Sequence, residues 1–403
     1  MDVFVARQPI FNRCQQVFGY ELLYRLGTEN YYPDSNGDYA SSEVIANSFL
    51  LFGLESLTGG KRAFINFTEN LLKNEVAANL PNDLIAVEIL EHVKRNKEIV
   101  TACKRLKELG YMLVLDDFVY ESVYEPLLDI ADIIKIDFLE TPSENRKNLI
   151  NKYRNKKVNF LAEKVETIDD FKQALESGFT YFQGYFFSKP IIISGKDIPA
   201  NKLNYIQLLH EINMVDLDFD RLDNIIKRDV SLSYKLLRYI NSAAFGFRTK
   251  ITSIKHALVM LGIQEIKKWL SLITLKGMCE DKPDEILTSS IIRARFGELI
   301  AQKCGLADRS SDLFLVGMFS LIDAIIGRSM SDILAELPVS EDVKKTLLGE
   351  KHIYRDIFEL ILSYEKGDWK SFSYYASLIK LDEKEVPQFY IMSLEWANGF
   401  NQI

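Results

Sequence analysis

The chain has 403 residues, of which 47% are hydrophobic and 26% charged, a composition typical of a globular protein large enough for two domains. A net charge of −8 argues against a broad surface for nucleic acid, and no apolar run reaches the roughly 18 residues of a membrane span. We therefore expect that the chain binds neither nucleic acid nor a membrane. Four scattered cysteines without a Cys-x-x-Cys pair, and a start unlike a signal peptide, favour a reducing cytoplasm over a zinc or disulfide framework.

The first half of the chain alternates short apolar runs with amphipathic segments. The runs, which predict strands, are Val3 to Ile10, Gln16 to Tyr24, Ala63 to Phe67, Leu84 to Ile89, Tyr111 to Leu115, Ile133 to Ile136, Phe160 to Ala162 and Tyr181 to Phe187. Between them, 93–109 has helical spacing and is followed by Gly110, and a capping box at Thr167 and Asp170 predicts a helix that ends at Gly178. This alternation predicts a mostly parallel sheet and favours a compact (β/α) barrel over an open sheet.

One of these runs ends in two adjacent carboxylates, Asp116 and Asp117. Burying a bare carboxylate costs several kcal/mol or more unless something compensates it. Two interpretations are open for this stretch alone: a cation lies beside the aspartates, or the strand simply ends there and both side chains face water.

Polar residues also occur within or directly after the other predicted strands. They are Glu21, Asn66, Glu88, Asp116 with Asp117, Lys135 with Asp137, Glu163 with Glu166, and Gln183. Barrel enzymes carry their chemistry at the carboxyl ends of the strands, so these side chains are expected at one mouth. Oxygen ligands suit Mg²⁺ or Mn²⁺, and several carboxylates could hold two metals, an arrangement that cleaves phosphodiesters. Lys135 and Arg25 would then supply positive charge for a phosphate.

The first half resembles an EAL domain, the barrel family that hydrolyses or binds cyclic di-GMP. The matching blocks are Gln8-Pro-Ile10, Glu21-Leu-Leu-Tyr-Arg25, Asn66 in Phe-Ile-Asn-Phe, Glu88 and Glu91 in Val-Glu-Ile-Leu-Glu, Asp116-Asp-Phe118, Lys135-Ile-Asp137, Glu163-Lys-Val-Glu166 and Gln183-Gly-Tyr-Phe-Phe-Ser-Lys-Pro190. So many blocks in order over about half the chain make the resemblance specific.

The resemblance implies hydrolysis of cyclic di-GMP to linear pGpG, with Mg²⁺ or Mn²⁺ as cofactor. The implied metal ligands are Glu21, Asn66, Glu88, Asp116, Asp117 and Glu163; the implied catalytic residues are Glu21, Lys135 and Glu163; and the implied substrate-binding residues are Arg25, Asp137 and Gln183. Glu91 would brace the loop after the paired aspartates. Because active EAL domains are often dimers, a homodimer is one expected assembly.

Two departures from the family pattern concern activity. Leu22 replaces the central alanine of the signature, which is a mild change. The loop 119–124 begins with Val119, where active members carry glycine, and a β-branched residue tolerates a positive φ poorly. Loop displacement by even ~1 Å can cost on the order of a hundredfold in rate, so we expect hydrolysis to be weakened or lost.

The character of the chain changes after a join at 191–204, and we place an all-helical domain at 199–403 after a barrel at 1–198. Amphipathic helices are predicted at 222–227, 233–242, 254–261 and 264–275, with Ser253 as an N-cap and Gly262 as a C′ residue. Residues 228–242 and 254–262 resemble an HDOD domain, a helical family distantly related to HD phosphohydrolases. No histidine is followed by the aspartate that HD enzymes need. We therefore expect a non-catalytic module that binds an unidentified protein. His256 is expected on a helix surface or in a satisfied polar contact, and Trp269 in the core.

Two functional hypotheses follow from the resemblance. In the first, the barrel is a metal-dependent phosphodiesterase for cyclic di-GMP, which the nearly complete ligand set favours. In the second, an inactive barrel acts as a cyclic di-GMP sensor or protein-interaction scaffold that signals through the helical domain, which the altered loop favours. A purely structural role fits poorly, because neutral residues would have sufficed at so many acidic positions.

Overall fold

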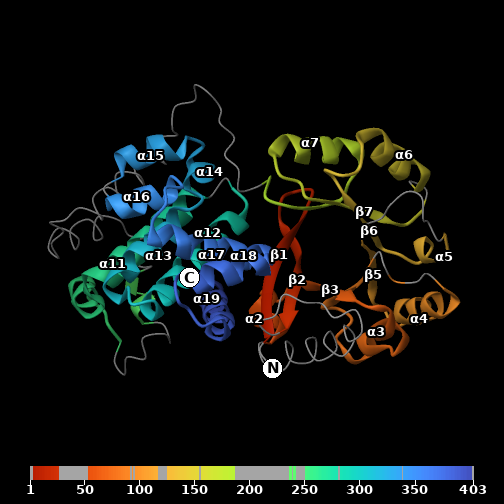
Figure 1. Ribbon diagram of the computed structural model, residues 1–403, viewed down its shortest axis with the longest axis horizontal. Coiled ribbons are helices and arrows are strands. Elements are labelled where there is room, and N and C mark those ends of the chain that lie inside the picture. The colour runs from red at the N-terminus through yellow and green to blue at the C-terminus, as the bar shows by residue number, and fades with distance from the viewer. Residues whose placement is uncertain are drawn as a thin grey trace. The chain divides into compact units, whose positions relative to one another are not determined.

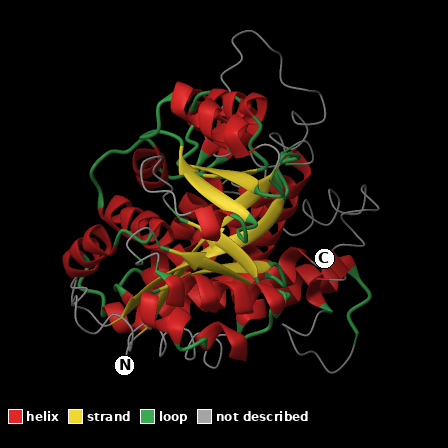
Figure 2. Cartoon of the chain, turned by 90° about the vertical axis from the view of Figure 1, so that its right-hand side faces the viewer, coloured by secondary structure: helices red, strands yellow, loops and turns green. Residues whose placement is uncertain are grey.

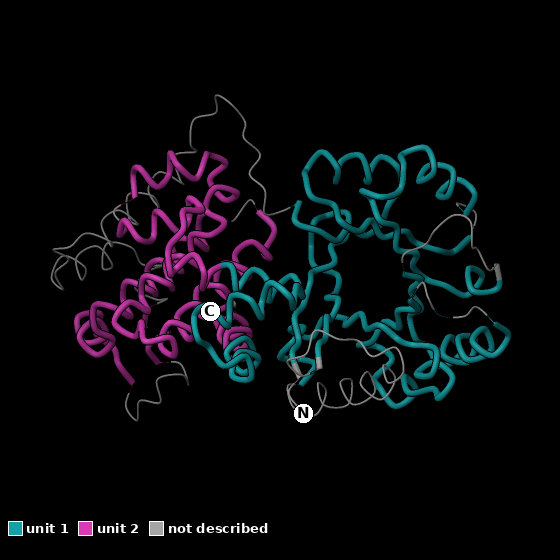
Figure 3. Tube along the Cα trace, viewed as in Figure 1, with its two compact units in different colours: residues 1–189, 359–391 teal, residues 190–358, 392–403 magenta. Residues whose placement is uncertain are grey.

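The computed structural model describes residues 3–26, 53–90, 93, 96–116, 125–153, 156–186, 236–237, 239–241, 250–279, 282–337 and 339–401. By its contacts the chain divides into two compact units (Figure 3): one joins Met1–Lys189 with Glu359–Ile391, and the other joins Pro190–Phe358 with Met392–Ile403. The boundary expected at 198/199 lies outside the described residues and stays a prediction. The association of Glu359–Ile391 with the first unit was not anticipated.

The first unit is built on a closed barrel of eight strands, which are joined in chain order. They are β1 (Val3–Asn12), β2 (Val17–Leu26), β3 (Arg62–Phe67), β4 (Ile85–Ile89), β5 (Met112–Leu115), β6 (Ile133–Asp137), β7 (Asn159–Glu163) and β8 (Tyr181–Gln183). Each coincides with one of the predicted apolar runs, so the barrel prediction is confirmed. β1 is antiparallel to both β2 and β8, whereas the other neighbouring strands are parallel.

Short helices link the strands and lie outside the barrel (Figures 1 and 2). They are α2 (Leu54–Thr58), α3 (Glu69–Lys73), η2 (Val76–Asn79), α4 (Lys97–Glu108), α5 (Glu125–Leu128), α6 (Ser143–Tyr153) and α7 (Ile168–Ser177). The predicted capping box is present at α7, where the Thr167 hydroxyl accepts from the Asp170 N–H and the Asp170 carboxylate accepts from the Thr167 N–H. Gly178 ends this helix in the left-handed conformation, as expected.

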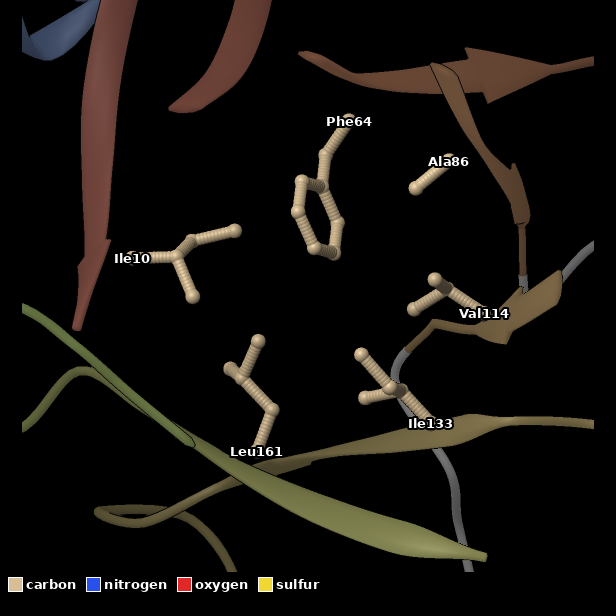
Figure 4. Close-up of a cluster of buried hydrophobic side chains, with 6 residues drawn as sticks. All are labelled: Ile10, Phe64, Ala86, Val114, Ile133 and Leu161. Atoms are coloured by element: carbon tan, nitrogen blue, oxygen red, sulfur yellow. The ribbon is translucent and has the colours of Figure 1, made fainter. Parts of the chain in front are cut away.

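A layer of apolar side chains fills the barrel interior (Figure 4). Its members are Ile10, Phe64, Ala86, Val114, Ile133 and Leu161, all fully buried. Burying each of the larger ones contributes about 1.5–3 kcal/mol. β2 contributes Gly19 beside this layer, because a Cβ there would lie 2.7 Å from the Phe64 ring. The glycine thus leaves room for a phenylalanine in the barrel centre.

The rest of the described chain is helical, as predicted. The helices are α11 (Ile254–Met278), α12 (Asp284–Lys303), η5 (Ala307–Arg309), α13 (Ser310–Phe319), α14 (Ile322–Ile326), α15 (Met330–Glu336), α16 (Glu341–Leu347), α17 (Ile353–Lys366), α18 (Trp369–Leu378), η6 (Glu383–Glu385) and α19 (Val386–Asn401). Ser253 caps α11 through the His256 N–H, and Gly262 leaves the helical region at φ 75°, which kinks the helix where a break was expected. His256 is exposed and Trp269 is buried.

The predicted helix 222–227 lies outside the described residues, as do five of the ten residues of the predicted helix 233–242. Among the helices that the structure describes, none is long and apolar enough to cross a bilayer.

Candidate active site at the mouth of the barrel

A polar layer lies directly above the apolar layer, on the side of the mouth. Residues two apart in a strand share a face, so a polar residue two positions beyond an apolar layer residue also points into the barrel. The pairs are Gly19 and Glu21, Phe64 and Asn66, Ala86 and Glu88, Val114 and Asp116, Ile133 and Lys135, Leu161 and Glu163, and Tyr181 and Gln183. In β1, which runs the opposite way, Gln8 precedes Ile10.

Lys135 is the centre of this layer. Its side chain is 1% exposed, and its Nζ lies 2.9 Å from both Asp116 Oδ1 and Glu163 Oε1. Glu88 Oε1 and Glu21 Oε1 follow at 3.3 Å and 3.5 Å. The structure therefore brings together five residues that lie on five strands or strand ends, as the sequence predicted. One ammonium group faces four carboxylates, so the site carries an excess of negative charge.

Burial and the neighbouring charges shift the pKa values of this cluster in opposite directions. Burial lowers the pKa of Lys135, but the four surrounding carboxylates outweigh it and hold the pKa well above its usual value. Burial raises the pKa of Glu163 to about 7, against the attraction of Lys135. The pKa of fully buried Glu88 is raised well above its ordinary value, again chiefly by burial. A second cation would relieve both carboxylates.

Gln183 holds the Glu21 carboxylate and is itself hydrogen-bonded to Gln8. Gln183 Nε2 donates to Glu21 Oε2 over 2.6 Å and to Gln8 Oε1 over 3.1 Å. The family resemblance predicts substrate binding for Gln183 and gives Gln8 no role. The missed signal is that β1 is antiparallel, so that its inward polar residue comes before its apolar layer residue.

The oxygen donors fit a hard cation. Within the described residues no group of three acidic, histidine or cysteine side chains is arranged to hold a metal ion, and the Lys135 ammonium lies among the carboxylates instead. Yet Asn66 Oδ1 and both carboxylate oxygens of Glu88 are buried and accept no hydrogen bond, and of these only Glu88 Oε1 lies in an ion pair, 3.3 Å from the Lys135 ammonium. Asn66 and Glu88 are register partners on β3 and β4, which places these acceptors side by side. Unsatisfied carboxylate and amide oxygens are what Mg²⁺ or Mn²⁺ would use.

Two residues predicted to bind substrate, Asp137 and Arg25, form ion pairs with residues outside the cluster around Lys135. Asp137 is buried, accepts from the N–H groups of Leu139 and Glu140, and pairs with Lys164 at 2.5 Å. These hydrogen bonds and Lys164 lower the pKa of Asp137 although its burial acts the other way. Arg25 is also buried, and its Nη2 lies 2.8 Å from Glu383 Oε2. Their roles toward substrate stay predictions, as do those of Asp117, Glu91 and the loop 119–124, which lie outside the described residues.

Comparison with protein families assigns the two halves of the chain. Residues 53–190 match the EAL domain, which defines the barrel as one of this class, and residues 198–349 match the HDOD domain. The chain belongs to the family of proteins in which an EAL domain is followed by an HDOD domain.

Two relatives cover nearly the whole chain. The uncharacterized protein YuxH of Bacillus subtilis (strain 168) is 41% identical over 407 residues, which is 99% of either chain. The cyclic di-GMP phosphodiesterase CdgJ of Vibrio cholerae is 34% identical over 403 residues, covering 99% of this chain and 93% of that protein.

Solved structures match the barrel half. A calcium and cyclic di-GMP complex of BlrP1 from Klebsiella pneumoniae is 21% identical, with a TM-score of 0.40, over 47% of this chain and 56% of that one. A standalone EAL protein of Vibrio cholerae bound to cyclic di-GMP is 25% identical, with a TM-score of 0.38, over 47% of this chain and 92% of that one.

Proposed function

We propose that this chain is a cyclic di-GMP phosphodiesterase, dependent on a divalent metal, that opens its substrate to linear pGpG. The observation that carries the proposal is the convergence of four carboxylates on buried Lys135 at the barrel mouth. The phosphodiesterase CdgJ, which matches along nearly the full length, supports the same substrate.

Glu21, Asn66, Glu88, Asp116, Asp117 and Glu163 would hold the metal, with Mg²⁺ or Mn²⁺ as the suited ion. Such an ion supplies Lewis-acid polarisation of a phosphodiester and lowers the pKa of a nearby water. Gln183 fixes the orientation of the Glu21 carboxylate.

Two residues of the cluster are suited to the proton and charge movements of hydrolysis. Glu163 would accept a proton from the attacking water at its carboxylate, and a bound metal would lower its pKa from the value of about 7 that burial gives it in the metal-free site. Lys135 stays protonated and would place a fixed positive charge beside the phosphate.

The helical part of the chain is proposed as a regulatory or interaction module. All four cysteines are free thiols, which supports the cytoplasm as the location, where a second messenger would act.

The second candidate is a sensor that binds cyclic di-GMP without turnover. The residue that favours it is Val119, in the sequence Asp116-Asp-Phe-Val119, where a glycine-rich turn is usual in active members.

Chromatography of cyclic di-GMP incubated with the purified protein and Mn²⁺ or Mg²⁺ distinguishes the two candidates. Metal-dependent pGpG that disappears in Glu21→Ala establishes the enzyme. Binding without product establishes the sensor, and the absence of both contradicts the proposal.

A further inference from the structure

The β1–β2 pair extends beyond the barrel on the side of the mouth. β2 pairs with β3 only over Gly19–Glu21, and β1 pairs with β8 only over Ile10–Asn12, whereas β1 and β2 pair with each other as far as Val3 and Leu26. Because β2 is parallel to β3, its residues after Glu21 project past the polar layer. Leu23 and Arg25 alternate onto the same strand face as Glu21, so they continue the lining of the mouth.

A C-terminal segment of the same compact unit covers this extension. We call residues 359–385, comprising the end of α17, the turn at Gly367, α18 and η6, the mouth hairpin (Figure 3). Phe4 on β1 is fully buried, and its ring lies 6.1 Å from Trp369 and 5.8 Å from Phe372 between centroids. The hairpin is thus held to the extension by an aromatic cluster.

The turn of the mouth hairpin reaches the polar layer itself. The Gln8 Nε2 donates to the backbone oxygen of Lys366 over 3.3 Å, and Gln8 Oε1 accepts from the glutamine that holds Glu21. A Cβ on Gly367 would lie only 2.8 Å from Leu23 Cδ1. The turn therefore lies against the mouth-lining face, and two hydrogen-bonded side chains, Gln8 and Gln183, connect it to the Glu21 carboxylate.

The carboxylate of Glu383, at the C-terminal end of the mouth hairpin, binds Arg25. Its Nη2 lies 2.8 Å from Glu383 Oε2, and its Nη1 donates to Ser373 Oγ over 3.0 Å. Ser373 in turn donates to the same Glu383 oxygen over 3.1 Å. The Arg25 side chain is only 5% exposed. A guanidinium binds carboxylate and phosphate oxygens with the same planar set of donors, so Glu383 holds the position that a phosphate would take.

We infer that the mouth hairpin is an autoinhibitory gate, in which Glu383 substitutes for a nucleotide phosphate on Arg25 and must leave before substrate can enter. The inference rests on the proposed function, since it takes a cyclic dinucleotide as the displaced ligand. When the binding-competent state is only a fraction of the population, apparent affinity falls by that fraction. Release of the hairpin would therefore raise affinity without changing any residue that holds the metal.

The first test weakens the closed state. Glu383→Gln keeps the size of the side chain but removes its charge, and we expect a Kd for cyclic di-GMP about fivefold to tenfold lower than that of the native chain by calorimetry with Ca²⁺. Glu395→Gln makes the same charge change at an exposed site on α19 and is expected to leave the Kd unchanged. An unchanged Kd in Glu383→Gln contradicts the gate.

The second test locks the closed state. Leu23 Cβ lies 3.4 Å from the position of a Cβ on Gly367, at the short end of the range of about 3.5–4.5 Å in disulfides, so Leu23→Cys with Gly367→Cys brings two thiols within bonding reach. The positive φ of Gly367, +67°, strains the backbone of both the oxidised and the reduced form equally. The oxidised protein should lose cyclic di-GMP binding and regain it on reduction. Each form is the control for the other, because the two substitutions are present in both. Equal binding in both forms overturns the gate and leaves the proposed function standing.

A third readout is independent of any nucleotide. Phenylglyoxal modifies accessible arginines, and mass spectrometry would follow Arg25. We expect faster modification in Glu383→Gln and slower modification in the oxidised cysteine pair than in the native chain. If these rates shift as expected while no form binds cyclic di-GMP, the proposed function fails and the gate stands with another ligand. If the rates are all equal, the gate fails.

Discussion

Gln183 Nε2 lies 2.6 Å from Glu21 Oε2 and so joins the last strand of the barrel to the second. The two residues are 162 positions apart in the sequence, and β1 lies between their strands. Both side chains are buried, so the amide fixes which way the carboxylate faces. A buried carboxylate that is oriented by a hydrogen bond is a better metal ligand than one that rotates.

Loss of this hydrogen bond should weaken metal binding. We expect Gln183→Ala to lower the affinity for Mn²⁺ by about 10- to 100-fold in calorimetry, because partners of a metal ligand typically contribute that much. Gln173→Ala, at an exposed position on α7, is the matched control and should bind Mn²⁺ as the native chain does. Native affinity in Gln183→Ala would show that Glu21 does not need its partner.

Gly184, which follows Gln183, lies where the neighbouring backbone leaves no room for a side chain. Gly184 has φ +138°, and a Cβ there would lie 2.1 Å from the backbone oxygen of Val165. Val165 cannot easily move, because its N–H donates to Gln183 and its oxygen accepts from Phe186. We expect Gly184→Ala to lower the free energy of unfolding by about 2–4 kcal/mol, from strain and overpacking together.

Hydrogen exchange of the barrel amides would measure this loss. Gly399→Ala is the matched control, since Gly399 is in α19 with nothing within 4 Å of its Cβ position, and alanine there should stabilise the helix by about 0.5–1 kcal/mol. Similar effects of the two changes would mean that the backbone near Val165 adapts.

The barrel could be predicted because its signals are local. Each strand is an apolar run, and a polar residue follows two positions after the layer residue, as in Ala86 and Glu88 or Leu161 and Glu163. Gln8 was missed because β1 runs the opposite way, and strand direction is not visible in a short apolar run.

The partner of Arg25 could not be predicted from the sequence. Glu383 is 358 positions away and lies in a charged stretch that resembles any solvated surface. The pairing depends on where the mouth hairpin packs in the folded protein. A charged residue on a short helix carries no sequence signal for that position.

Asp323 predicts a pH dependence outside the barrel. Burial raises the pKa of this carboxyl above its ordinary value, although the Ala324 N–H donates to it over 2.9 Å. A carboxyl with a higher pKa in the folded state binds more protons when folded, so its contribution to stability is lost as pH rises above the unfolded value of about 3.9. We therefore expect Asp323→Asn to raise the melting temperature at pH 7, with a gain that shrinks as pH falls toward 4.

Thermal scans between pH 4 and pH 8 would test this expectation. Asp308→Asn is the control, because Asp308 is exposed on η5 and its replacement should change stability by no more than about 0.5 kcal/mol. A destabilised Asp323→Asn at pH 7 would mean that the negative charge of Asp323 is favourable in the folded protein.

Lys135 should be required for the stability of the metal-free barrel. Its ammonium lies within 3.5 Å of four carboxylates, so Lys135→Met removes the positive charge while nearly preserving side-chain volume. Breaking a buried ion pair costs about 3–5 kcal/mol, because a charge is left without compensation. We expect the free energy of unfolding to fall by that amount, and hydrogen exchange of the β4–β7 amides would measure this fall. We also expect pGpG formation to be lost.

Added Mn²⁺ separates the structural role of Lys135 from a chemical one. A divalent cation would compensate the same carboxylates, so Mn²⁺ should stabilise Lys135→Met more than it stabilises the native chain, while pGpG formation stays absent if the ammonium acts on the phosphate. Lys172→Met, at an exposed site on α7 that pairs with Asp169, is the matched control and should change stability by no more than about 0.5 kcal/mol. Native stability in metal-free Lys135→Met would show that the carboxylates become neutral by taking up protons, for which the raised pKa values of Glu88 and Glu163 provide the route.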